Sequence, residues 1–261
     1  MKLRIVWMAL LLSSCRSDAP KDEPPTIEKV SQEITFDSVA RLGPHYAVSS
    51  IQHTERRSGE EVHRSTESTD IAWNSWDSFH IQRSLDGAAT FEVIVHDGSY
   101  ASRNGRGPWT AEMDGESSRL EVYTTWNVWD EALGSFKDRI LYEEIGNTVV
   151  DGRDTRHFRI SLAPEDKKKS KAQGRASMKP VKIEGDVHLD AQTAVRLSAK
   201  VTAISRQGSL ERGIQLEIQR SRIGQAQPIE APSVQIGTAG DLLKKMPKRR
   251  SGRGPDPSKL R

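Results

Sequence analysis

Apolar and polar residues alternate through most of the middle of this chain, and this period of two constrains the fold more than any other feature. The clearest runs lie at residues 91–95, 158–162, 181–189, 195–201 and 214–218. A strand that alternates in this way has one buried side and one solvent-facing side, as in an antiparallel sheet. Turn-forming pairs such as Asp97-Gly98 separate the runs. Roughly nine to eleven strands predict a mainly β fold with minor α, a curved antiparallel sheet or half-open barrel covered by one or two helices.

One stretch departs from this alternation and favours a helix. Its bulky apolar residues recur three or four positions apart, at Val122, Trp126, Trp129, Leu133 and Phe136. This spacing predicts one apolar stripe along a helix over 118–133. Ser118 and Glu121 fit a capping box at its start, and Gly134 fits a C-terminal cap. Residues 120–128 also alternate, so a strand is the competing interpretation, and the caps favour the helix.

A helix with so bulky an apolar stripe must lie against the sheet, and two roles are open to it. The helix either fills the concave face of the sheet, which needs no ligand, or lines and covers a cavity for an apolar molecule. For the second role the candidate ligand-binding residues are Trp109, Val122, Trp126, Trp129 and Leu133.

The first fifteen residues have the three parts of an export signal. Lys2 and Arg4 are basic, residues 5–12 are almost wholly apolar, and small residues precede Cys15, which is the only cysteine. The apolar run is shorter than the roughly 20 residues that span a bilayer. Residues 12–15, Leu-Ser-Ser-Cys, resemble the lipobox of bacterial lipoproteins. An ordinary secretory signal with an incidental cysteine is the alternative.

The resemblance to a lipobox implies cleavage before Cys15 and attachment of diacylglycerol to its thiol, with acyl chains such as palmitate. Two or more chains anchor a protein stably to a membrane. The mature protein is then held on a membrane and faces the periplasm. Arg16 stands where an aspartate retains enterobacterial lipoproteins in the inner membrane, which favours the outer membrane over the inner one.

Charge and composition divide the chain into four parts. We expect a signal peptide over 1–14, a lipidated proline-rich tether over 15–31, a β-rich half-barrel-like domain over 32–235 and a basic disordered tail over 236–261. Residues 242–261 contain eight Lys or Arg and one Asp. Such a tail is suited to weak attraction to an anionic surface, and nucleic acid is not an expected partner of an exported protein.

The sequence contains no convincing catalytic set. Its seven histidines are scattered, at His45, His53, His63, His80, His96, His157 and His188. His96 precedes Asp97, but neighbours on a strand point to opposite faces, so the two side chains would meet only if the turn reorients them. No metal-binding spacing and no nucleotide-binding or nucleophile motif is present. We therefore expect no catalytic residues, no metal, no cofactor and no enzymatic activity.

Three phrases in order along the chain resemble the LolA/LolB-like superfamily of lipoprotein carriers and lipid-binding lipoproteins. They are the strand and turn leading to Trp109, residues 149–162 (VVDGRDTRHFRISL) and residues 185–201 (GDVHLDAQTAVRLSAKV). The resemblance implies a half-open antiparallel barrel that binds a lipid or acyl chain on its concave face. A non-enzymatic interaction or structural lipoprotein that binds another envelope component is the alternative function.

Overall fold

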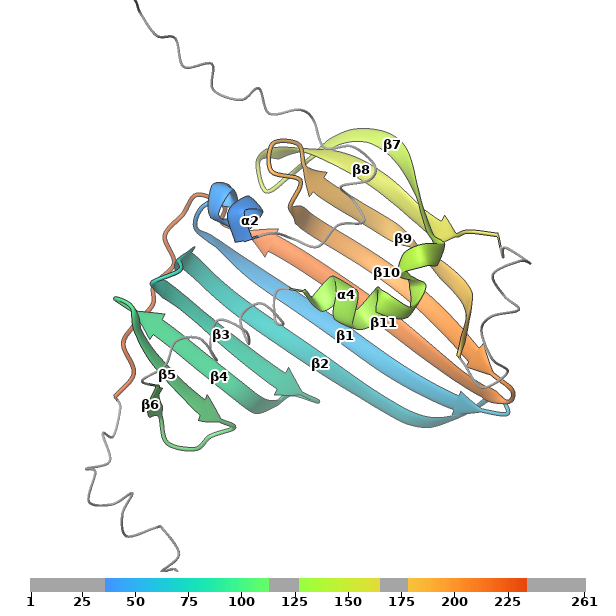
Figure 1. Ribbon diagram of the computed structural model, residues 1–261, viewed down its shortest axis with the longest axis horizontal. Coiled ribbons are helices and arrows are strands. Elements are labelled where there is room, and N and C mark those ends of the chain that lie inside the picture. The colour runs from blue at the N-terminus through green and yellow to red at the C-terminus, as the bar shows by residue number, and fades with distance from the viewer. Residues whose placement is uncertain (1–35, 113–126, 165–177, 234–261) are drawn as a thin grey trace, which may run out of the picture.

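The computed structural model describes residues 36–112, 127–164 and 178–233, and its main feature is one large antiparallel sheet (Figure 1). Its strands are β1 His45–Arg57, β2 Glu60–Ser75, β3 Ser78–Leu85, β4 Ala88–His96, β5 Ser99–Asn104, β6 Thr110–Glu112, β7 Ile140–Val150, β8 Arg153–Leu162, β9 Lys179–Asp190, β10 Arg196–Gln207 and β11 Leu210–Ser221. The helices are α2 Phe36–Leu42, α4 Val128–Leu133 and the 3-10 helix η1 Gly134–Arg139. All these elements lie within the predicted domain 32–235. The signal peptide, Cys15 with the whole tether, and the basic tail lie outside the described residues.

The strand order joins the two ends of the domain at the centre of the sheet. The order is β6-β5-β4-β3-β2-β1-β11-β10-β9-β8-β7, and β1 pairs with β11 along its whole length. Neighbours in sequence pair through hairpins on both sides of this seam, and β6 and β7 form the two outer edges. The sheet is strongly twisted, with α4 lying across one face over its central strands (Figure 1). The predicted curved antiparallel sheet with minor α is confirmed.

The predicted turns are also confirmed, and their backbone explains the residues found there. Asp97 and Gly98 have φ angles of 50° and 73°, and the Asp86-Gly87 and Asp151-Gly152 pairs have the same combination of positive angles. Two successive positive φ angles define a turn whose twist matches that of the flanking strands. Asp tolerates this conformation better than most residues and glycine adopts it freely.

The predicted helix is only partly described, and one of its caps differs from expectation. Ser118, Glu121, Val122 and Trp126 lie outside the described residues, and the helix within them spans Val128–Leu133. Gly134 follows the helix, but its φ of −54° is right-handed, and the chain continues into η1. Gly134 is therefore the C-terminal cap, as predicted, but without the left-handed conformation that is common at this position. The continued winding places Phe136 in the core, where it is fully buried.

Three apolar clusters make up the core of the described residues. The largest lies between α4, η1 and strands β1 and β8 to β11. A second joins α2 to β1, β2, β3 and β4 around Trp73 and Phe79. A third joins α2 to β10 through Leu42, Val195 and Leu197. None of the described helices is long and apolar enough to cross a membrane.

Candidate functional site

The face of the sheet that α4 covers is the candidate site, and we call it the inner face. Ile51 of β1, Val201 of β10 and Leu216 of β11 lie on it and are buried in one cluster with Trp129 and Leu133. Alternate residues of the same strands point to the opposite, outer face, which includes the exposed Val48 and Lys200. The structure therefore brings Trp129 and Leu133 of the predicted stripe together on the inner face.

The interior beneath α4 is nearly filled in this conformation. A cavity of about 20 Å³ lies between α4 and strands β1, β2, β10 and β11. Its lining includes Ala47, Ile71, Trp129, Arg196, Ile218 and Arg220. A cavity of this size admits about one water molecule. Pockets that hold a whole small molecule are more than ten times larger, about 300 to 1,000 Å³. Binding of a larger ligand at this place requires α4 to move away from the sheet.

Contacts of different kinds hold α4 on the inner face. The guanidinium of Arg196 lies 4.4 Å from the centre of the Trp129 ring, a cation–π contact. The Trp129 indole also hydrogen bonds to the hydroxyl of Tyr142 on β7, whose pKa is raised by burial. On the solvent-exposed side of α4, a carboxylate oxygen of Glu131 lies 3.7 Å from a guanidinium nitrogen of Arg83 on β3. This last pair is partly exposed and contributes little to stability.

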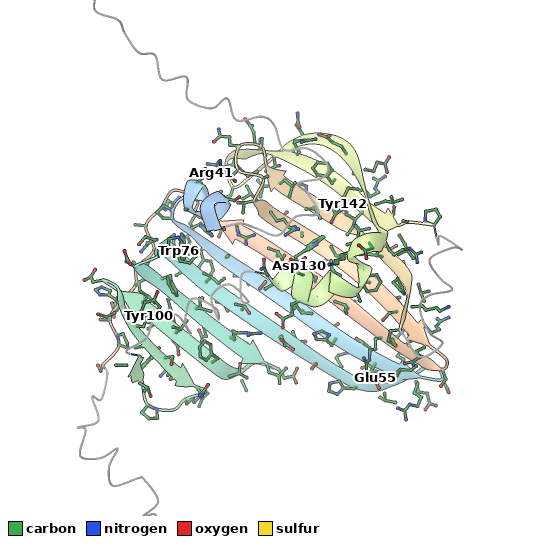
Figure 2. The ribbon with its side chains drawn as sticks, viewed as in Figure 1. Arg41, Glu55, Trp76, Tyr100, Asp130 and Tyr142 are labelled. Carbon is green, nitrogen blue, oxygen red and sulfur yellow. The ribbon has the colours of Figure 1, made fainter. Side chains whose placement is uncertain are left out.

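Arg196 lies at the start of β10, under α4, and is buried. Burial lowers its pKa, and the charges of Tyr142 and Asp130 act in the opposite direction. In Figure 2 the labelled Asp130 lies on α4, over the middle of the sheet. Arg196 therefore has an acidic neighbour on the helix that covers it.

Arg220 of β11 is the second buried cation of the inner face, with 4% of its surface exposed. Its Nη1 donates a hydrogen bond to the backbone carbonyl of Arg196, while its Nε has no acceptor among the described residues. Burial lowers the pKa of Arg220 to about 10, and the positive charge of Arg196 acts in the same direction. The guanidinium still carries its charge at neutral pH.

His45, at the start of β1, is fully buried and close enough to Arg220 for their charges to interact. Burial lowers the pKa of His45 to about 4, and the charge of Arg220 lowers it further, against a hydrogen bond to the Gly43 carbonyl. The Nδ1 to oxygen distance of that bond is 2.8 Å. The imidazole is therefore neutral at pH 7, with its proton on Nδ1.

Sequence reasoning missed this group of buried cations, although one of them had a visible signal. Arg220 continues the alternation of Ile214 and Ile218 and so occupies the inner-face phase of β11. A charged residue in phase with buried apolar residues is a usable signal. Arg196 offers no such signal, because the pairing of β9 and β10 shifts register between Arg196 and Ser198 and changes the phase of the strand.

Trp109 is not brought together with the other predicted ligand-binding residues. The guanidinium of Arg103 lies 4.5 Å from the centre of the Trp109 ring. Arg103 in turn donates from Nε to Glu92, which is buried, at 2.6 Å. Glu92 neighbours Val93 of the inner-face core, so it points to the outer face. Trp109 therefore lies on the outer side of the β5–β6 edge, while Val122 and Trp126 lie outside the described residues.

The histidines form pairs but no catalytic triad among the described residues. His96 and Asp97 do meet, with 3.4 Å between Nδ1 and Oδ2, because the positive φ of Asp97 turns its side chain back. On the outer face, His188 hydrogen bonds to Ser198 at 2.9 Å. The nearby acid, Asp186, contacts a different imidazole, that of His157. The His157 ring stacks on the His188 ring. A triad needs one imidazole to contact both the hydroxyl and the acid.

Among the described residues, no group of three or more His, Cys, Asp or Glu side chains is arranged to hold a metal ion. The two buried arginines of the inner face, Arg196 and Arg220, carry positive charge and do not favour a metal ion there. What the site offers chemically is an apolar surface under a short helix with buried hydrogen-bond donors beside it.

No protein-family model matches this sequence, and a search of curated proteins finds no match. Solved structures that match this chain include LprF from Mycobacterium bovis, at 14% identity and a TM-score of 0.33, over 80% of this chain and 99% of that one. A LolA superfamily protein from Nitrosomonas europaea matches at 7% identity and a TM-score of 0.22, over 74% and 90% of the two chains.

MucB matches at 18% identity and a TM-score of 0.29, over 76% of this chain, and the matched part spans 62% of MucB. Members of the superfamily that the sequence resembles are therefore among the matches. At these identities and TM-scores the likeness gives no residue of this chain a functional role.

Proposed function

We propose that this protein is a cell-envelope lipoprotein that binds an apolar ligand, such as a lipid or acyl chain, between α4 and the inner face of the sheet, without catalysing a reaction. One observation carries the proposal. A single six-residue helix and the 3-10 turn after it cover an apolar cluster that extends over five strands of an open-edged sheet. An apolar ligand can replace the helix on that surface without exposing the core to water.

The energy of such a replacement can be worked out from the residues involved. Trp129, Leu133 and Phe136 are the large side chains that the helical segment buries against the sheet. Exposing each costs about 2 kcal/mol, or about 6 kcal/mol together. Each buried methylene contributes about 0.8 kcal/mol, so about eight methylenes offset the loss. The proposal therefore implies that only chains of roughly this length or longer bind well.

A series of neutral alcohols from hexanol to hexadecanol tests this threshold, with affinity for the full chain measured by calorimetry. We expect weak binding below about eight carbons and a steep gain in affinity above that length. If α4 competes with the ligand, Trp129→Ala tightens binding of dodecanol, because less contact has to be broken. Trp109→Ala is the matched control, since it removes the same side chain from the outer face. Affinity that does not depend on chain length contradicts the proposal.

Anchoring to the membrane belongs to the same proposal. We infer that Cys15 carries the lipid and that the protein faces the periplasm, on the outer membrane in preference to the inner, with the basic tail attracted to anionic surfaces. Growth with labelled palmitate tests the anchor. The wild-type protein is expected to take up label, and Cys15→Ser is expected to take up none. A labelled Cys15→Ser variant would contradict this assignment.

A second candidate function is docking of another envelope component, and the edge strand β7 favours it. Leu141, Ile145 and Val149 are 48%, 44% and 62% exposed along this strand. The strand also lies at the edge of the sheet, where no other described strand pairs with its free side. An exposed apolar edge suits the addition of a partner's strand. A photo-crosslinking residue at Val149 is expected to capture one partner in cells, and the same residue at the exposed Val62 of β2 serves as the control.

A further inference from the structure

Arg220 is a buried cation that forms no ion pair with an acid within the described part of the chain. Its Nη1 donates to the backbone carbonyl of Arg196, its Nε has no acceptor among the described residues, and the positive charge of Arg196 acts on it. The negative charge of Asp130 acts on Arg196. Among the described residues, two arginines and one acid, Asp130, therefore meet beneath α4.

Burying a positive charge in this way destabilises the fold unless a negative charge lies beside it. A buried charge without a partner loses its hydration and gains nothing in return, and buried charges in proteins are normally paired. Arginine keeps its proton at neutral pH, so the buried group stays charged. The neighbouring His45 is neutral, so it adds no charge to the pair. A bound anion would relieve this cost.

The surroundings of Arg220 supply further donors for an anion. Ser49 of β1 and Thr69 of β2 face each other across the two strands, and both are buried in the lining of the cavity beneath α4. They lie one row along the inner face from Arg220, which pairs with the small Ala47. Arg196 lines the same cavity. Two guanidinium groups and two hydroxyls therefore border one small space, and all four can donate hydrogen bonds to oxygen.

We propose that this cavity is the site for the anionic end, a carboxylate or phosphate, of an amphiphile whose apolar part lies between α4 and the sheet. The inference rests on the proposed function and specifies its ligand class. The cavity of about 20 Å³ admits an oxygen atom of the anionic group but not the chain attached to it. The chain then continues along the apolar cluster under α4, so one ligand contacts both parts of the inner face.

The test compares dodecanoate and dodecyl phosphate with neutral dodecanol, and inorganic phosphate alone, on the full-length protein by calorimetry. Arg220→Met is the informative variant, because it keeps an unbranched apolar side chain at this position and removes the charge. We expect it to fold at least as stably as wild type, since replacing an unbalanced buried charge by an apolar side chain is stabilising. Arg212→Met, on the same strand but exposed and beside Glu55, is the matched control.

We expect wild type and Arg212→Met to bind both anionic amphiphiles at least tenfold more tightly than dodecanol, and Arg220→Met to lose this preference while still binding dodecanol. Ser49→Ala combined with Thr69→Val is expected to reduce the preference in part. Equal affinity of wild type for dodecanol and dodecanoate, or a preference that survives Arg220→Met, overturns the anion site alone. Binding of none of the three amphiphiles overturns the proposed function and this inference together. If inorganic phosphate binds in an Arg220-dependent way while no amphiphile binds, the ligand is a small anion and the proposal of an amphiphile is refuted.

Discussion

Acidification should weaken this fold through His45, and the structure gives both the sign and the size of the effect. Burial, aided by Arg220, lowers the pKa of His45 to about 4 from 6.5. The unfolded chain therefore binds this proton at a higher pH than the folded one. The contribution of the neutral imidazole is complete above pH 6.5 and is lost as the pH falls to about 4. A shift of this size corresponds to about 3 kcal/mol of unfolding free energy.

The assay is urea denaturation of wild type and His45→Asn between pH 7.5 and pH 4. Asparagine places an amide N–H near the position of Nδ1, so it keeps a donor for the Gly43 carbonyl and cannot titrate. We expect the wild type to lose about 3 kcal/mol more than the variant over this range. Burial also lowers the pKa of His188, so both proteins retain some pH dependence of the same sign.

His63→Asn, on the exposed part of β2, is the control and is expected to follow the wild type. Parallel pH profiles for wild type and His45→Asn would refute the reasoning. So would an imidazole signal of His45 that titrates near pH 6.5 in the folded protein by NMR.

Three substitutions test the packing that positions the site, each by its unfolding free energy in urea. Gly185→Ala should destabilise the fold by about 3 kcal/mol, because the alanine Cβ would lie 2.1 Å from the Lys200 carbonyl oxygen. An unchanged urea midpoint would refute the close approach of β9 and β10. Gly134→Ala should stabilise by about 0.5 to 1 kcal/mol, because Gly134 has right-handed helical angles and open space around it, and a loss of stability would count against those angles. Phe136→Ala should cost about 3 to 5 kcal/mol, and a cost below about 1 kcal/mol would mean that η1 is not docked on the sheet.

Much of the sheet was predictable, because alternation and turn chemistry are local properties. Phe91, Val93 and Val95 show directly which residues of β4 face the apolar cluster, and Asp97-Gly98 marks the end of the strand. The pairing of β1 with β11 was not predictable in this way, since the two strands are separated by most of the domain. Such a long-range pairing depends on how the apolar faces of all the strands and helices pack together in the folded domain.

The candidate site was only partly predictable, because its details depend on tertiary contacts. The spacing of Trp129 and Leu133 correctly indicated one apolar helix face, since that spacing is a local property. The position of Trp109 depends on Arg103, a contact across the turn between β5 and β6 that no periodicity encodes. The burial of Arg196 depends on a register shift between two strands, which a single strand's sequence does not show.

The central claim is that the inner face beneath α4 is the place where an apolar chain binds. The most direct test is photolabelling of the full-length protein with dodecanoate that carries a diazirine on its chain, followed by mapping of the labelled peptides by mass spectrometry. The account predicts label on α4 and on the inner-face residues of β1 and β11, such as Ile51 and Ile218, with competition by unlabelled dodecanoate. Label confined to the outer face or to β7, or label that dodecanoate does not displace, would contradict it.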